Sequence, residues 1–142
     1  MASVFSAGVT TIENAAMEPE VEDLGNFLNA MGANVQGAGT STIRIKGVKQ
    51  LQGCEYEAIG DRIEAATYIM AGLMTNSHIT VKHFKTQHID SILETLKGIG
   101  AKLEVSDVSV EVFPSQLEGG KIETTPFPGF PTDAQAHCGK YI

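Results

Sequence analysis

The chain has 142 residues and a mass of 15.1 kDa, and its content of 42% apolar and 19% charged residues is that of a globular protein with a substantial core. Collagen, coiled coils and wholesale disorder are excluded, and no apolar run approaches the roughly 20 residues of a membrane span. The net charge of −7, with Arg44 and Arg62 as the only arginines, argues against nucleic-acid binding. Cys54 and Cys138 lie too far apart for a metal motif or disulfide framework, and residues 1–4 lack the basic region of a signal peptide. We therefore expect a cytoplasmic protein without a metal site or a membrane partner.

The first third of the chain predicts a strand, a helix and a second strand. Residues 10–13 match residues 79–82, a stretch that contains an expected strand, and so predict a strand here. A helix follows, in which Pro19 stands near the favoured first position and Gly32 marks the end. A pair of glycines then turns the chain into a strand over residues 42–45. One face of the helix carries all of its large apolar residues: Val21, Leu24, Phe27, Leu28 and Met31.

The middle of the chain predicts two more helices and three strands. Asp61, with Glu64 three residues later, forms a capping-box pattern at the start of a helix that runs to about Thr75. A second helix ends at Gly100 and has one apolar face, formed by Ile89, Ile92, Leu93, Leu96 and Ile99. Strands are expected over residues 79–81, 102–105 and 108–112.

An internal repeat links these two regions. Residues 28–35 (LNAMGANV) match residues 96–103 (LKGIGAKL), and residues 10–13 match residues 79–82 with nearly the same offset. A third copy begins near Asp133, which occupies the position of Asp61 in the repeat. The repeat predicts an α/β (α+β) fold built of strand-helix-strand-helix-strand-strand (βαβαββ) units, with incomplete units at both ends. The alternative is a compact domain whose terminal helices are short.

Several longer stretches resemble the bacterial UDP-N-acetylglucosamine 1-carboxyvinyltransferases of the enolpyruvyl transferase family. They are residues 11–21 (TIENAAMEPEV), 27–33 (FLNAMGA), 37–40 (GAGT), 61–65 (DRIEA) and 126–136 (PFPGFPTDAQA). The related 5-enolpyruvylshikimate-3-phosphate synthases share the fold but lack the first and last of these strings. The resemblance implies the inside-out α/β barrel of that family. Residues 1–58 would end its first domain and residues 59–142 would start its second.

The resemblance also implies a reaction. The family transfers the enolpyruvyl group of phosphoenolpyruvate to the 3′-hydroxyl of UDP-N-acetylglucosamine and releases phosphate, in the cytoplasm and without a cofactor, as the first committed step of peptidoglycan synthesis. We expect this segment to need the rest of the enzyme for activity. Two alternatives stay open, namely a non-catalytic interaction module that keeps the fold and a segment of a 5-enolpyruvylshikimate-3-phosphate synthase-like enzyme.

Asp133 is the candidate catalytic residue. Its place in the PFPGFPTD string matches the family aspartate that is proposed to accept the proton of the sugar hydroxyl. The alternative is an ordinary helix N-cap at Thr132 or Asp133. The backbone of the preceding loop, including Phe130 and Pro131, and Thr132 after it, would line the uridine–sugar site.

Four further residues match family positions near the substrates. Asp61 and Arg62 match the Asp-Arg pair at the phosphate end of the cleft, although a helix cap and an exposed first-turn residue explain them equally well. Glu18 matches an acidic residue of the cleft, as does Glu20, but Glu18 is also suited to cap the helix at Pro19.

The sequence departs from the family at a few positions. Gly60 replaces a usual proline, which should loosen the crossing between domains, Ala66 replaces a glycine, and His137 replaces a glutamine. Neither cysteine occupies the position of the family's reactive cysteine.

Overall fold

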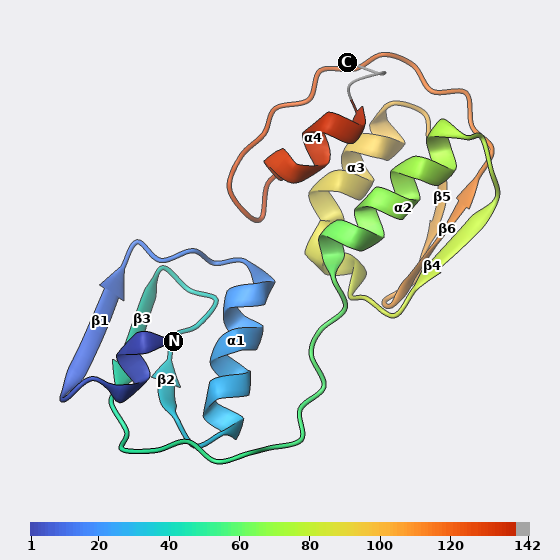
Figure 1. Ribbon diagram of the computed structural model, residues 1–142. Helices are drawn as coiled ribbons and strands as arrows, with labels where there is room; N and C mark the ends of the chain where they lie inside the picture. Colours follow the sequence, from blue (N-terminus) through green and yellow to red (C-terminus); the bar gives the residue numbers. More distant parts are fainter. Residues whose placement is uncertain (139–142) are drawn as a thin grey trace. The chain divides into compact units, whose positions relative to one another are not determined.

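The computed structural model describes residues 1–138, and the chain divides into two compact units, Met1–Ile59 and Gly60–Ile142. Each unit contains a three-stranded antiparallel sheet with helices packed against it (Figure 1). In residues 1–138 no helix combines the length and the apolar character that crossing a membrane requires.

Unit 1 contains one α-helix and one sheet. The 3-10 helix η1 and strand β1 come first, then helix α1 and the last two strands, in the order β1-β3-β2 across the sheet. The bounds are Ala2–Phe5 for η1, Val9–Glu13 for β1, Pro19–Ala30 for α1, Asn34–Gln36 for β2 and Thr42–Lys46 for β3. The core consists of Val4, Leu28, Val35, Ile43 and Ile45. The predicted strands and helix are confirmed, and Pro19 is the first residue of α1.

The segment after β3 runs without regular structure but is tied to α1. The hydroxyl of Tyr56 donates a 2.7 Å hydrogen bond to Oδ1 of Asp23, and its ring centroid lies 5.3 Å from that of Phe27. The hydrogen bond to Asp23 raises the pKa of Tyr56 above its ordinary value. The amide of Gln52 donates to the carbonyl of Met31 at 2.8 Å.

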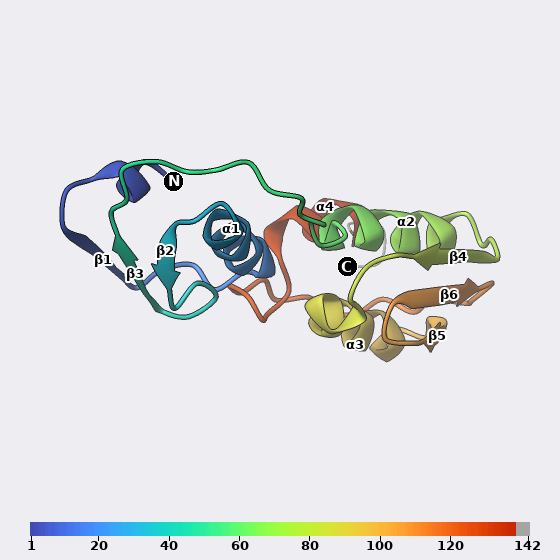
Figure 2. The same cartoon turned by 90° about the horizontal axis from the view of Figure 1, so that it is seen from below.

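Unit 2 contains the remaining elements, with strand order β4-β6-β5. Their bounds are Arg62–Met74 for α2, Ile79–Lys82 for β4, Thr86–Ile89 for the 3-10 helix η2, Asp90–Gly98 for α3, Lys102–Val105 for β5, Ser109–Phe113 for β6 and Thr132–Cys138 for α4. One continuous core joins α2, α3, α4 and the sheet. Helix α4 lies beside α2 and contacts it (Figures 1 and 2).

The predicted repeat is confirmed at the level of elements, because β1, α1, β2 and β3 correspond to β4, α3, β5 and β6. In both sheets the last strand occupies the centre. Helices α1 and α3 also end alike, with Gly32 at φ +96° and Gly100 at φ +97°. The amide after each glycine donates a 3.0 Å hydrogen bond to the carbonyl of Leu28 or Leu96, respectively. This is the Schellman motif, for which glycine is the favoured residue.

The two units differ in what covers the equivalent helix. In unit 2, Ile92 of α3 is fully buried in the core that α2 helps to form. Its counterpart Leu24 in α1 is 37% exposed. The repeat also places residues 1–7 over residues 70–76, which include the end of α2, but here they form only the short helix η1. The inward residue Ile12 of β1 is therefore 40% exposed, and an apolar face of α1 and β1 stays open within unit 1.

Candidate functional site

The start of α2 is built around Asp61. Its backbone is extended (φ −68°, ψ 109°), and its carboxylate oxygen Oδ1 accepts hydrogen bonds from the amides of Ile63 at 2.8 Å and Glu64 at 3.0 Å. These bonds satisfy two of the amides that a helix start leaves without partners, so the predicted N-cap is confirmed. Contact of this exposed carboxylate with substrate stays a prediction.

Removal of this cap has a defined expected result. Asp61→Ala should lower the free energy of unfolding of unit 2 by about 1 kcal/mol, because both amides lose their acceptor. Asp61→Asn keeps an acceptor oxygen and should stay within about 0.5 kcal/mol of the unsubstituted chain. Urea denaturation followed by circular dichroism measures both. An equal loss in both variants would show that the carboxylate stabilises unit 2 by its charge rather than as a cap.

Arg62 is buried rather than exposed, and its predicted place at the phosphate end of the cleft stays a prediction. The residue is only 7% exposed, which corrects the expectation of an exposed first-turn side chain. Its guanidinium carbon lies 5.3 Å from the centroid of the Phe127 ring, within the range of a cation–π contact. The peptide bond from Phe127 to Pro128 is cis. Sequence reasoning missed Phe127, because only the folded chain brings this distant aromatic residue to α2.

The loop before α4 is closed by its own backbone. The amide of Thr125 donates to the carbonyl of Phe130 at 3.0 Å, and the amide of Gly129 donates to that of Pro126 at 2.8 Å. Phe130 is 4% exposed and belongs to the core of unit 2, while Pro131 is half-buried. The side chain of Phe130 is thus a packing group, and only backbone atoms of this residue are left to face a ligand.

Asp133 lies in the first turn of α4, one residue after the helix begins at the exposed Thr132. Its side chain is exposed, and no described group donates a hydrogen bond to its carboxylate. The next residue, Ala134, is buried against the core. Helices α2 and α4 begin at the same end of unit 2 (Figures 1 and 2), so the structure gathers Asp61, Arg62 and Asp133 at that end.

The acidic candidates Glu18 and Glu20 lie in unit 1. Glu18 occupies the N-cap position of α1, as predicted, but its side chain makes no capping hydrogen bond. Its Oε2 atom is buried, and no described group donates to it. Glu20 is exposed in the first turn of α1, where a negative charge is favourable. Their role at a substrate cleft stays a prediction.

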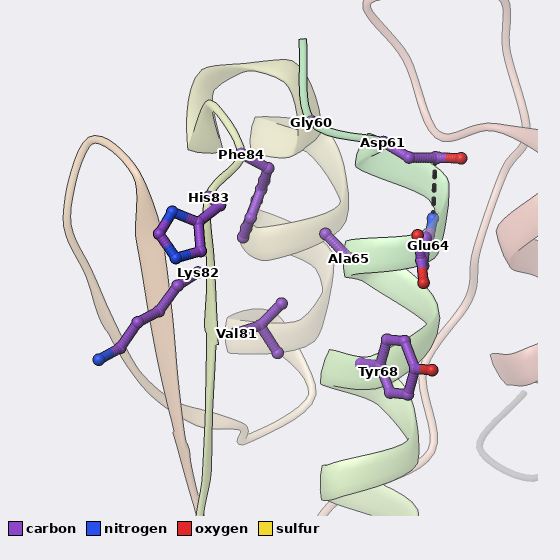
Figure 3. A pocket seen from close by; sticks show the side chains of 9 residues that line it. All are labelled: Gly60, Asp61, Glu64, Ala65, Tyr68, Val81, Lys82, His83 and Phe84. Atoms are coloured by element: carbon purple, nitrogen blue, oxygen red, sulfur yellow. Dashed lines mark hydrogen bonds between the residues drawn. The ribbon is translucent and has the colours of Figure 1, made fainter. Parts of the chain in front are cut away.

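A cavity of about 310 Å³ lies between α2 and β4 in unit 2 (Figure 3). Its polar groups diverge, since Val81 faces the core and Lys82 therefore projects from the opposite face of the strand. At its rim, a Cβ atom on Gly60 would lie 2.1 Å from the carbonyl oxygen of His83, so this glycine permits close packing of the two backbone segments. Its expected loosening of the crossing between domains stays a prediction. The lining residues are Gly60, Asp61, Glu64, Ala65, Tyr68, Val81, Lys82, His83 and Phe84.

Within the described part of the chain, no three histidine, cysteine, aspartate or glutamate side chains come together as a metal site. Cys54 is exposed and carries a free thiol. The side chains of His137 and Cys138 and residues 139–142, on which some sequence expectations fell, lie outside what the structure describes.

Comparisons with known proteins give these elements a family. The chain is 48% identical over 136 residues to UDP-N-acetylglucosamine 1-carboxyvinyltransferase of Prochlorococcus marinus, covering 96% of this chain and 31% of that protein. It is 49% identical over 137 residues to UDP-N-acetylglucosamine 1-carboxyvinyltransferase 2 of Clostridium acetobutylicum, covering 95% and 32%. The chain thus spans about a third of the length of these curated relatives, and the predicted resemblance is confirmed.

Solved structures confirm the predicted fold. The enolpyruvyl transferase NikO from Streptomyces tendae matches with a TM-score of 0.78 at 21% identity, over 98% of this chain and 35% of that one. EPSP synthase from Acinetobacter baumannii matches with a TM-score of 0.56 at 18% identity, over 86% and 29%. The family profile described as EPSP synthase (3-phosphoshikimate 1-carboxyvinyltransferase) matches residues 1–140. The chain therefore belongs to the EPSP synthase (3-phosphoshikimate 1-carboxyvinyltransferase) family.

Proposed function

We propose that this chain forms part of a UDP-N-acetylglucosamine 1-carboxyvinyltransferase. The observation that carries the proposal is the near 50% identity, across almost the whole chain, to proteins of that name. The likeness to EPSP synthase structures is a likeness of fold at much lower identity, so it gives the shikimate-type alternative less support. The activity would be transfer of the enolpyruvyl group of phosphoenolpyruvate to UDP-N-acetylglucosamine in cytoplasmic peptidoglycan synthesis.

The domain assignment belongs to the same proposal. Residues 1–58 would form the end of the first enolpyruvyl transferase domain and residues 59–142 the start of the second. The division of the chain into compact units next to Gly60 supports this assignment. Each of the two compact units contains a single three-stranded sheet, whereas a family domain contains several βαβαββ repeats. In compact unit 1 an apolar face of α1 is left open.

The chemistry assigns a role to Asp133. Attack by the sugar 3′-oxygen on C2 of phosphoenolpyruvate forms the new C–O bond while C3 gains a proton. The hydroxyl proton passes to a base, and phosphate leaves as C3 loses a proton again. An exposed carboxylate at the start of α4 is available to accept the hydroxyl proton. The cations that hold phosphate and diphosphate are needed in addition.

The isolated chain is expected to show no turnover. Its net charge is −7, and of its two arginines Arg62 is buried against Phe127 while Arg44 lies on strand β3 of unit 1. Phosphate release from phosphoenolpyruvate and UDP-N-acetylglucosamine should equal the rate without protein, and should appear when a segment supplying the rest of the enzyme is added. Turnover by the chain alone would contradict this expectation.

The interaction-module alternative makes the opposite prediction for the mixture. A non-catalytic module would stay inactive with the complementary segment even if the two form a stable complex. Co-purification together with phosphate release favours the transferase. Complex formation without release, under conditions in which an intact relative is active, favours the module. Replacing UDP-N-acetylglucosamine by shikimate 3-phosphate in the same assay tests the remaining alternative.

A further inference from the structure

We propose that Arg62 is a positioning residue, which holds the loop before α4 through the ring of Phe127 and thereby orients the carboxylate of Asp133. The inference rests on the proposed role of Asp133 as the base. It is an alternative to the prediction that Arg62 lies at the phosphate end of the cleft, and it assigns Phe127 a role that no sequence pattern indicated.

The placement of Arg62 is the first part of the argument. The residue begins α2 directly after the Asp61 cap, so its backbone is fixed by the two capping hydrogen bonds. Its side chain is buried, and burial of a guanidinium is unfavourable unless partners compensate the lost hydration. The face of the Phe127 ring at 5.3 Å is one such partner. The planar guanidinium is better suited to this stacking than the compact ammonium of lysine.

The loop is the second part. Phe127 lies inside a turn that is closed by the hydrogen bond from Thr125 to Phe130, and Phe130 itself is anchored in the core. The contact with Arg62 therefore fixes the tip of a loop whose far end is already held. The nearby prolines restrict the backbone further, so a displacement of Phe127 should also shift the start of α4.

Asp133 is the third part. Its exposed carboxylate receives no hydrogen bond from the described residues, so its direction depends on where α4 begins. The loop leads directly into that helix, and α4 packs against α2, which carries Arg62. Arg62 thus influences the orientation of Asp133 in two ways, through α2, which packs against α4, and through the loop that leads into α4.

Amide hydrogen exchange in the full chain tests the first link. In Arg62→Gln and in Phe127→Leu, the Thr125 amide should exchange at least tenfold faster relative to the amides of the central strand β6, and the double variant should be no faster than either single one. Phe127→Tyr keeps a ring and should match the unsubstituted chain. Arg44→Gln removes the other arginine, which lies in unit 1, and should leave Thr125 unchanged. Unchanged exchange in both single variants, or additive effects in the double variant, would overturn the proposal.

Kinetics of the chain combined with the rest of the enzyme test the second link. Arg62→Gln and Phe127→Leu should each lower kcat about tenfold and leave the KM for phosphoenolpyruvate close to that of the unsubstituted chain. Phe127→Tyr, which keeps the ring, should retain the unsubstituted kcat. If Arg62 bound phosphate, Arg62→Gln would instead raise that KM, and Phe127→Leu would have no effect. If Asp133→Asn retains turnover, the proposed base is wrong while the exchange result can still stand. If Asp133→Asn abolishes turnover and Arg62→Gln leaves kcat intact, the positioning role is wrong.

Discussion

Ile92→Ala should lower the free energy of unfolding of unit 2 by about 2–5 kcal/mol, whereas Leu24→Ala in unit 1 should cost about 1 kcal/mol or less. The two residues occupy equivalent places in the repeat, on α3 and α1. Ile92 is fully buried, so its truncation removes apolar contacts and leaves a cavity. Leu24 is 37% exposed, so water can fill the space that its side chain vacates. Ile92 and Leu24 therefore form a matched pair, because they occupy the same position of the repeat and differ in burial.

The measurement has to separate the units, because two compact units need not unfold in one transition. Urea titration followed by the NMR signals of β6 for unit 2 and of β3 for unit 1 reports each one. Ile92→Val serves as a graded control and should cost about 0.5–1.5 kcal/mol. A loss for Leu24→Ala as large as that for Ile92→Ala would mean that the face of α1 is covered in solution. Sedimentation analysis would then show whether a second copy covers it.

Local sequence signals predicted the elements of the fold well. The periodicity of Ile89, Ile92 and Leu96 and the stop at Gly100 depend on neighbouring residues alone, and the structure confirms α3 and its Schellman motif. The exposure of Leu24 was not predictable in the same way. Its sequence pattern equals that of a buried residue, and the difference arises from whether another helix packs on that face.

In the candidate site, too, features set by neighbouring residues were predictable and features set by distant contacts were not. The Asp61 cap was predictable, because a cap involves only the next three residues. The burial of Arg62 against Phe127 was not, because a charged first-turn residue is ordinarily exposed and its partner comes from a distant loop. Phe130 shows the converse case. Its motif resembles a substrate loop, while its side chain contributes to the core of unit 2.

Asp133→Asn should lower kcat of the reconstituted enzyme by about 10²–10⁴-fold, because an amide cannot accept the hydroxyl proton during attack on phosphoenolpyruvate. The substitution preserves size and keeps one acceptor oxygen. Asp133 is exposed and lies in the first turn of α4, so losing its charge should change the free energy of unfolding by no more than about 1 kcal/mol. A large kinetic loss without unfolding would therefore point to chemistry rather than stability.

The matched control for this substitution is Glu94→Gln, which removes one exposed carboxylate from α3 of the same unit. It changes the net charge equally and should leave kcat within about twofold, since surface charges far from the reacting atoms act weakly. Asp133→Glu keeps a base but displaces it by one methylene, and should retain more activity than Asp133→Asn. Equal kcat values for Asp133→Asn and the unsubstituted chain would assign proton acceptance to another residue and leave the start of α4 a structural role only.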